Sequence, residues 1–399
     1  MKNNPSELAL LGGSPLFGTR LFVGRPNLAP TAELLTEIGA VLDSRWLSND
    51  GPQLKAFESE LATTLGVKHC VAVCNATIGL LLLLRALALK GEGIVPSFTF
   101  IATVHAVQWS GLRPVFCDVL PDTHTLDPAQ VATLISPDTS AILGVHLWGQ
   151  ACEIETLAAL AQQHRLALIF DAAHALLSRW QGRLIGAFGQ AEVFSFHATK
   201  FVNSLEGGAI TTDDDQLAEK LRLMRNFGFV DYDQIEALGL NAKMNEICAA
   251  VGRSSLTYSA DFLARNRENY QHYRAQLSKI PGVSLLALST QSNFQYVVVQ
   301  IDAQTFGLSR DQVVEILHAE QVIARRYFYP GAHRVSPYRE LYPQRSPLPV
   351  TEQLAAEVLI LPTGTGISST EIETLCAFLN WLQTQAREVQ LALNQQIQA

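Results

Sequence analysis

The sequence predicts an α/β fold in which helices cover a mostly parallel sheet and a smaller C-terminal α+β domain follows. Short runs rich in β-branched residues alternate with longer helical patterns from about residue 55 to 225. The chain has 399 residues, about two to three times the length of a typical domain. Hydrophobic residues make up 48% and charged residues 17% of it, so the composition favours a large buried core over a disordered chain.

The first part of the chain is expected to contain seven strands buried on both faces, because each run is almost continuously apolar. These strands cover residues 69–73, 93–96, 114–117, 141–146, 166–171, 192–196 and 208–212. Helical periodicity lies between them, over residues 54–65, 78–89, 156–164 and 215–225. The order of elements is that of an open sheet with helices on both faces.

The pattern changes from Asn245 onward. A helical stretch runs through Tyr270, a strand is expected over 295–301 and a helix over 310–320, and the Ser368–Glu371 spacing is a capping box that opens a last helix. We therefore expect a large domain over residues 1–250, with an N-terminal arm, and a small domain over 251–399. We expect a continuous helix to join them and their cleft to hold the ligand.

Charge and apolar patterning exclude several classes of partner. The chain has 29 Lys and Arg against 37 Asp and Glu, a net charge of −8, so no basic field favours nucleic acid. The most apolar stretch, residues 79–89, contains Arg85 and is far shorter than the roughly 20 residues of a membrane span. Residues 1–17 lack the pattern of a secretory signal, and we expect a cytoplasmic protein. The six cysteines are expected to be reduced core residues and no metal site is predicted.

Polar residues follow three of the predicted strands at their carboxyl ends, where open parallel sheets bind ligands. After strand 69–73 the chain reads Cys-Asn-Ala-Thr at residues 74–77 and a helix begins. Free backbone N–H groups at a helix start suit a phosphate. An ordinary N-cap by Asn75 or Thr77 explains the same residues.

The second of these strand ends carries Asp171, and His174 follows shortly after it. A carboxylate at the end of a buried strand is costly unless a cation or strong donors accompany it, and the cation is either part of a ligand or part of the protein. An N-cap aspartate is the alternative. His174 is equally consistent with a histidine satisfied beneath a loop.

The third strand leads through Ser195 to Lys200. A lysine among apolar neighbours is partly desolvated, which lowers its pKa from about 10.4 and frees its lone pair for a Schiff base. A single lysine is usually only a solvated charge. The three strand ends together predict pyridoxal phosphate, with an aldehyde for Lys200, a ring nitrogen for Asp171 and a phosphate for the 74–77 turn and Ser195.

Eight segments then identify a resemblance that covers nearly the whole chain. They are residues 46–52, 95–103, 145–149, 171–175, 195–200, 206–209, 239–246 and, more weakly, 326–333. In these segments the chain resembles the fold-type I, pyridoxal-phosphate-dependent sugar aminotransferases of the DegT/DnrJ/EryC1/StrS family. Lys200 stands where members of that family bind the cofactor covalently, and Asp171 stands where their carboxylate holds the pyridine nitrogen protonated. The resemblance also implies that Lys200, once released from the cofactor, acts as the catalytic base.

The resemblance assigns further cofactor contacts. Phe100 matches the aromatic residue that stacks on the ring, and Ala76, Thr77 and Ser195 match the phosphate cradle. Asn241 matches an asparagine that reaches the phosphate from the neighbouring subunit, so the resemblance implies a homodimer with composite active sites.

Two positions depart from the pattern of many relatives, which have glycine in place of Ala76 and glutamine in place of His174. Alanine is tolerable if backbone N–H groups bind the phosphate and φ is negative there. Histidine can still donate to the ring oxygen of the cofactor, although its charge then becomes variable. A dehydratase branch carries histidine in place of the lysine, and Lys200 argues against that branch.

The substrate implied by the motifs at 171–175, 195–200 and 203–208 is dTDP-4-keto-6-deoxy-D-glucose, aminated at C4 with L-glutamate as donor. A 3-keto-sugar nucleotide, a GDP-sugar and a keto-inositol stay open, the last because residues 9–13 resemble the inosose aminotransferases. Four residues are candidates either for contact with the sugar nucleotide or for packing at the domain junction: Trp148, Tyr327, Tyr329 and His333.

Two other classes of function are alternatives. A non-catalytic regulator that binds the same cofactor would require an added DNA-binding module or loss of the lysine, and the sequence shows neither. A nicotinamide dehydrogenase is suggested by Gly364 and Gly366 after an apolar run. The third glycine of that motif is missing, so these residues predict a turn.

Overall fold

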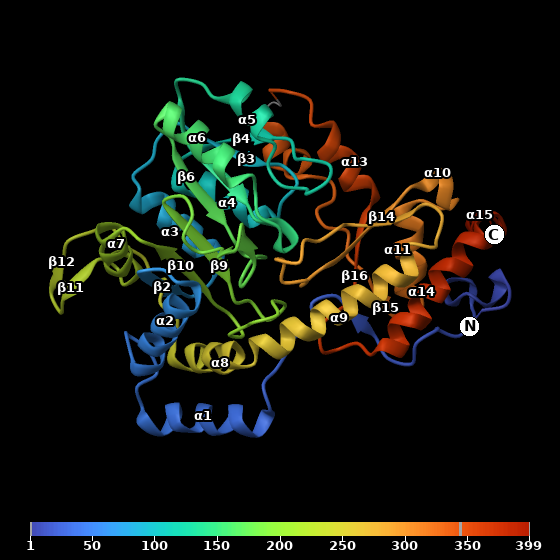
Figure 1. Ribbon diagram of the computed structural model, residues 1–399, viewed down its shortest axis with the longest axis horizontal. Coiled ribbons are helices and arrows are strands. Elements are labelled where there is room, and N and C mark those ends of the chain that lie inside the picture. Colours follow the sequence, from blue (N-terminus) through green and yellow to red (C-terminus); the bar gives the residue numbers. More distant parts are fainter. Residues whose placement is uncertain (1, 343–344, 399) are drawn as a thin grey trace.

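A seven-stranded sheet forms the centre of the first part of the molecule in the computed structural model, which describes residues 2–342 and 345–398 (Figure 1). The strands lie in the order β2-β10-β9-β6-β5-β3-β4. Their bounds are β2 His69–Val73, β3 Glu92–Pro96, β4 Arg113–Cys117, β5 Thr139–Val145, β6 Ala167–Asp171, β9 Ala191–Ser195 and β10 Gly208–Thr212. All pairings are parallel except those of β10, which is antiparallel to both neighbours. The predicted α/β class with a mostly parallel sheet is confirmed.

Helices cover both faces of this sheet, which explains the continuous apolar character of the strands. Consecutive residues of β6 show the two faces: Phe170 packs in one hydrophobic cluster with Phe57 of α2, and Ile169 in another with Leu80 of α3. The helices of this part are α2 Pro52–Leu65, α3 Ala76–Ala86, α4 Ile101–Ser110, α5 Pro128–Leu134, α6 Ile154–His164 and α7 Asp215–Arg225. The helix predicted over 78–89 therefore starts two residues earlier and ends three residues earlier, because Ala88 takes a left-handed backbone (φ 53°).

The second part contains an antiparallel sheet in the order β13-β14-β16, formed by Val283–Leu285, Val297–Ile301 and Val358–Leu361. Its main helices are α11 Arg310–Ala319, α14 Ser369–Thr384 and α15 Ala386–Gln398. The predicted capping box opens α14: the backbone N–H of Glu371 donates to the Ser368 hydroxyl, and the backbone N–H of Ser368 donates to the Glu371 carboxylate. Leu8 and Phe17 of the N-terminal arm pack into the hydrophobic cluster of this second part.

The two parts are not joined by a continuous helix, and that prediction is wrong. Helix α8, Glu246–Thr257, ends at Tyr258, whose backbone leaves the helical region (φ −91°, ψ 8°), and α9 runs from Ser259–Leu277. On the two sides of the break, α8 packs against α1 (Thr31–Ser44) and α2, and α9 packs against α14 (Figure 1). No proline or glycine lies at the break, so the periodicity of the sequence gives no sign of it.

The remaining elements are short or peripheral. They are the 3-10 helices η1 Pro5–Glu7, η2 Ala9–Leu11, η3 Leu147–Gly149 and η4 Ala332–Arg334, the helices α1 Thr31–Ser44, α10 Ala303–Phe306, α12 Tyr338–Leu341 and α13 Pro349–Glu357, and the strands β1 Leu21–Phe22, β7 Arg179–Trp180, β8 Arg183–Leu184, β11 Phe229–Asp231, β12 Gln234–Ile235 and β15 Val322–Ile323. None of the helices in residues 2–342 and 345–398 combines the length and the apolar character that crossing a membrane requires. All six cysteines are free thiols.

Candidate active site

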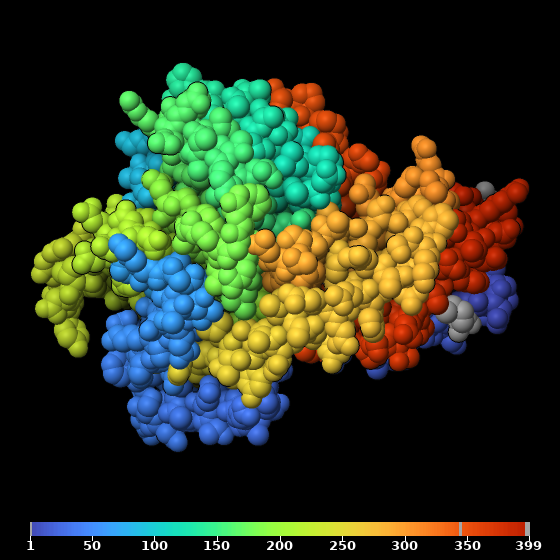
Figure 2. Space-filling model, in the orientation of Figure 1, coloured from blue at the N-terminus to red at the C-terminus, as the bar shows by residue number. Residues whose placement is uncertain are grey.

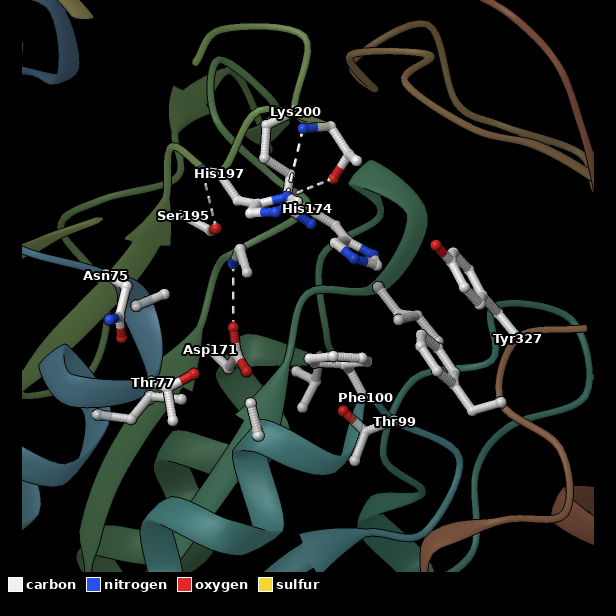
Figure 3. Close-up of a pocket in the computed structure, with 18 of the residues that line it drawn as sticks. Asn75, Thr77, Thr99, Phe100, Asp171, His174, Ser195, His197, Lys200 and Tyr327 are labelled. Carbon is white, nitrogen blue, oxygen red and sulfur yellow. Dashed lines mark hydrogen bonds between the residues drawn. The ribbon is translucent and has the colours of Figure 1, made fainter. Parts of the chain in front are cut away.

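A cavity of about 530 Å³ opens at the carboxyl ends of the parallel strands (Figure 3). The large sheet contributes most of its walls, and residues near β14 and after β15 close it from the second part of the chain. Nine polar residues at the strand ends or shortly after them line the cavity: Asn75, Thr77, Thr99, Asp171, His174, Ser195, His197, Thr199 and Lys200. The structure therefore brings the three predicted strand ends together in one space.

Lys200 lies in the loop after β9, and its Nζ donates a hydrogen bond to the Tyr296 hydroxyl at 3.2 Å. Burial lowers the pKa of the Lys200 amine from 10.5 to about 8, and the negative charge of Asp171 opposes this shift only in part. A substantial fraction of such an amine is neutral near pH 8. Lys200 can therefore act as a nucleophile or as a base.

Asp171 ends β6 and is 6% exposed. The Thr103 hydroxyl donates to its Oδ2 at 2.8 Å, and the backbone N–H of Ala173 donates to its Oδ1 at 3.0 Å. Burial raises the pKa of the Asp171 carboxyl, whereas these two donors and the Lys200 charge lower it. Burial is the largest of these effects, so the pKa of the carboxyl is raised overall, and two donors hold the group beside the cavity.

The first turn of α3 forms the opposite end of the cavity. The Asn75 side chain caps this helix by accepting from the backbone N–H of Ile78 at 2.9 Å. The N–H groups of Ala76 and Thr77 have no partner within the helix, and both residues line the cavity beside Ser195. This end can bind an anion such as a phosphate.

Glycine and alanine set the geometry of this turn. A Cβ on Gly208 of β10 would lie 2.6 Å from the backbone nitrogen of Ala76, so only glycine lets the strand approach the helix start this closely. Ala76 itself begins α3 with a right-handed helical backbone, so the alanine requires no strained conformation.

His174 and Phe100 face the space between these ends (Figure 3). His174 is 8% exposed, and its Nδ1 is buried without a hydrogen-bond partner. Burial first, and the Lys200 charge second, hold the pKa of His174 well below 6.5, so the ring is neutral. Phe100 is 58% exposed although it is a large aromatic residue. An unpartnered buried nitrogen and an uncovered ring suit a flat aromatic ligand with a polar substituent.

The four candidate sugar contacts lie in different surroundings. Tyr327 lines the cavity. Trp148 is fully buried, donates from Nε1 to His124 at 3.2 Å and stacks on Phe328. Tyr329 is 53% exposed and does not line the cavity. These contacts give Trp148 a packing role, because its indole faces other side chains on all sides.

His333, the last of the four, is also outside the cavity lining. It is buried, and its Nδ1 lies 2.6 Å from the hydroxyl of Ser97 after β3. Asn241 is exposed and likewise does not line the cavity of its own chain.

Sequence reasoning missed Thr103, Tyr296, Arg325 and Phe328. Thr103 lies within the 95–103 segment that carries the resemblance, and a polar residue three positions after Phe100 could have indicated it. Tyr296, Arg325 and Phe328 line the cavity from the second part of the chain. Phe328 lies within the weakly matching segment 326–333, whereas no local pattern marks Tyr296 and Arg325. Across the described ranges, no group of three or more His, Cys, Asp and Glu side chains could hold a metal ion.

Known proteins are similar to this chain in sequence and in fold. Residues 30–380 match the model of the DegT/DnrJ/EryC1/StrS aminotransferase family. The chain is 35% identical over 355 residues to a dTDP-4-amino-4,6-dideoxy-D-glucose transaminase of Shigella dysenteriae, covering 88% of this chain and 96% of that one. It is 34% identical over 346 residues to a GDP-perosamine synthase of Caulobacter vibrioides, covering 85% and 92%. The solved structure of DesI in the presence of its TDP-sugar product is similar with a TM-score of 0.94 and 49% identity, over 98% of this chain and 99% of DesI.

Proposed function

The chain belongs to the DegT/DnrJ/EryC1/StrS aminotransferase family, and on this basis we propose that it transfers an amino group from L-glutamate to C4 of dTDP-4-keto-6-deoxy-D-glucose. The product is dTDP-4-amino-4,6-dideoxy-D-glucose, and the cofactor is pyridoxal 5'-phosphate. One observation carries the proposal: Lys200, Asp171 and the start of α3 line the same cavity. The names of the Shigella relative and of DesI's TDP-sugar product support the choice of sugar nucleotide.

The residues of the cavity fit pyridoxal phosphate. The family depends on this cofactor, which when bound supplies an aldehyde that accepts the amino group and a ring that delocalises the electron pair left by a departing proton. Ala76, Thr77 and Ser195 would hold the phosphate. The unpartnered Nδ1 of His174 supplies a polar atom for the ring oxygen, and the exposed face of Phe100 supplies a surface for stacking.

Asp171 would keep the pyridine nitrogen protonated, because a buried carboxylate strongly favours a neighbouring positive charge. Its two hydrogen-bond donors fix the carboxylate and oppose its protonation. The neutral fraction of Lys200 takes up a proton from the carbon of glutamate that bears the amino group. The loop that holds Lys200 places its Nζ in the same cavity as Asp171 and His174, so one amine can take up the proton and return it.

The proposal is tested with the purified chain. Visible absorbance, borohydride reduction and peptide mass analysis are expected to place the cofactor on Lys200. Incubation with L-glutamate and dTDP-4-keto-6-deoxy-D-glucose is expected to release 2-oxoglutarate. Reaction with only a GDP-sugar, a 3-keto sugar nucleotide or a keto-inositol would contradict the substrate, and the GDP-sugar arm is included because of the GDP-perosamine synthase similarity. A protein that binds the cofactor but releases no 2-oxoglutarate with any of these substrates would favour the non-catalytic regulator instead.

We further propose that the enzyme is a cytoplasmic homodimer in which Asn241 reaches the phosphate in the partner's cavity. Asn241 is exposed and does not line its own cavity. Large apolar side chains are exposed on α1 and around the β11–β12 hairpin, and Figure 2 shows both segments at the edge of the molecule. The exposed apolar side chains of these two segments are Leu35, Leu42, Phe229, Val230, Tyr232, Ile235 and Leu238. Uncovered apolar surface of this extent favours association.

A further inference from the structure

The Lys200 amine has a hydrogen-bond partner that comes from outside the large sheet. Tyr296 directly precedes β14 of the three-stranded sheet, and its hydroxyl lies 3.2 Å from Lys200 Nζ. In the described part of the chain this is the one hydrogen bond that Nζ makes. The contact therefore connects the reacting amine to the second part of the molecule.

The position of the Tyr296 side chain is fixed by its surroundings. It is 6% exposed. Its ring centroid lies 4.4 Å from that of His174 and 5.2 Å from that of Trp148, the latter at an interplanar angle of 72°. Trp148 is itself fully buried. A ring held on two sides by aromatic neighbours leaves its hydroxyl little freedom to move away from Lys200.

We propose that Tyr296 is the positioning residue of the Lys200 amine, which it holds at the cavity through each change of protonation that the amine undergoes. This inference rests on the proposed function and names a residue that acts in it. A phenol hydroxyl accepts a hydrogen bond from an ammonium group and donates one to a neutral amine, so it partners Nζ in both charge states. Burial holds the pKa of Tyr296 well above 10, so the phenol keeps its proton. The proton of the reaction moves between the carbon of the amino donor and Nζ, and Tyr296 exchanges none.

Other groups near the amine do not replace this contact. Asp171 and His174 face Lys200 from the end of β6 and the loop that follows it. The charge of Asp171 raises the pKa of Lys200, and the charge of Lys200 lowers the pKa of His174. The remaining titratable or charged groups that line the cavity are His197, Glu206, Arg325 and Tyr327. None of them makes a hydrogen bond to Nζ within the described residues. Loss of the Tyr296 hydroxyl would therefore leave the amine without a hydrogen-bond partner in the protein.

The direction of the effect follows from the geometry. Nζ is the donor in the observed bond, and a charged donor makes the stronger bond. Removal of the acceptor therefore destabilises the ammonium more than the neutral amine, and the pKa of Lys200 falls. Loss of this one hydrogen bond is expected to lower the pKa of Lys200 by about one unit.

The test compares the full chain with Tyr296→Phe, which keeps the aromatic contacts and removes the hydroxyl. The matched control is Tyr273→Phe, which removes another buried hydroxyl, the one that donates to the backbone carbonyl of Pro362 at 2.8 Å. Lys200 of each protein, prepared without cofactor, is labelled with acetic anhydride across pH 6 to 10, and the labelled peptide is quantified by mass spectrometry. We expect the midpoint of Lys200 labelling to fall by about one unit in Tyr296→Phe and to stay unchanged in Tyr273→Phe.

A second measurement connects this shift to the reaction. In the cofactor-loaded enzymes, the single-turnover rate with L-glutamate is expected to fall about tenfold in Tyr296→Phe, with its optimum displaced to lower pH. An unchanged Lys200 midpoint in a folded Tyr296→Phe protein would overturn the inference, as would an equal shift in the control. Labelling needs neither cofactor nor substrate. A wild-type chain that binds no cofactor would therefore contradict the proposed function, and the labelling midpoints would still test the role of Tyr296.

Discussion

Replacing Lys200 with methionine is expected to stabilise the cofactor-free protein. Methionine fills similar space and carries no charge. The pKa of the lysine falls from 10.5 when unfolded to about 8 in the fold, so the folded chain binds fewer protons than the unfolded chain between these values. Unfolding is therefore increasingly favoured as pH falls from about 10.5 to about 8, and below that range the cost of the buried amine is fully present.

The size of this cost follows from the pKa values. A fall from 10.5 to about 8 corresponds to about 3 kcal/mol at pH 7, narrowing to about 2 kcal/mol at pH 9. The stability advantage of Lys200→Met over the wild type is expected to follow this trend. Urea-induced unfolding, followed by tryptophan fluorescence at pH 6.5, 7.5 and 9, measures it.

Asp171 provides the control, because the substitution also deprives this carboxylate of its cationic neighbour. Comparing Lys200→Met with its parent in the Asp171→Asn background removes the interaction between the two charges. The stability advantage of methionine is expected to be larger there, because Asp171 raises the pKa of the lysine. An advantage that does not change with pH, or a wild type more stable at pH 7, would refute the reasoning. Either result would mean that burial does not perturb this amine.

Three further experiments test other parts of the structure. Thr103→Val removes a donor to Asp171; it should raise the pKa of that carboxyl further and weaken cofactor binding about tenfold, as measured by spectroscopic titration. Mixing Lys200→Ala with Asn241→Ala, each inactive alone, should restore roughly a quarter of wild-type activity through hybrid dimers, whereas no recovery would argue against a shared site. Glu320→Gln removes the negative charge that pairs with the buried Lys2 ammonium group, and it removes one of the two oxygens that accept from the N–H groups of Ala9 and Leu16. It should cost about 3 kcal/mol of stability, and unchanged unfolding would show that the arm contributes little.

The strand ends show how much of this site the sequence determines. Three of the apolar strands, β2, β6 and β9, end in or lead into polar residues, and the carboxyl ends of such strands meet at one edge of the sheet. The sequence therefore predicted that Asp171, Lys200 and the 74–77 turn lie together, and the cavity contains all three. The capping box at Ser368 was equally readable, because its hydrogen bonds span only three residues.

Tertiary structure alone decided the rest. The hydroxyl of Tyr296 meets Lys200 across 96 residues of chain, Trp148 turns into a buried aromatic cluster, and the N-terminal arm packs on the C-terminal part. The chain leaves the helical conformation at Tyr258, and the helices on its two sides have different neighbours: α8 packs on α1 and α2, and α9 packs on α14. Periodicity and local hydrogen bonding report which face of an element is buried, but they carry no information on which distant element covers it.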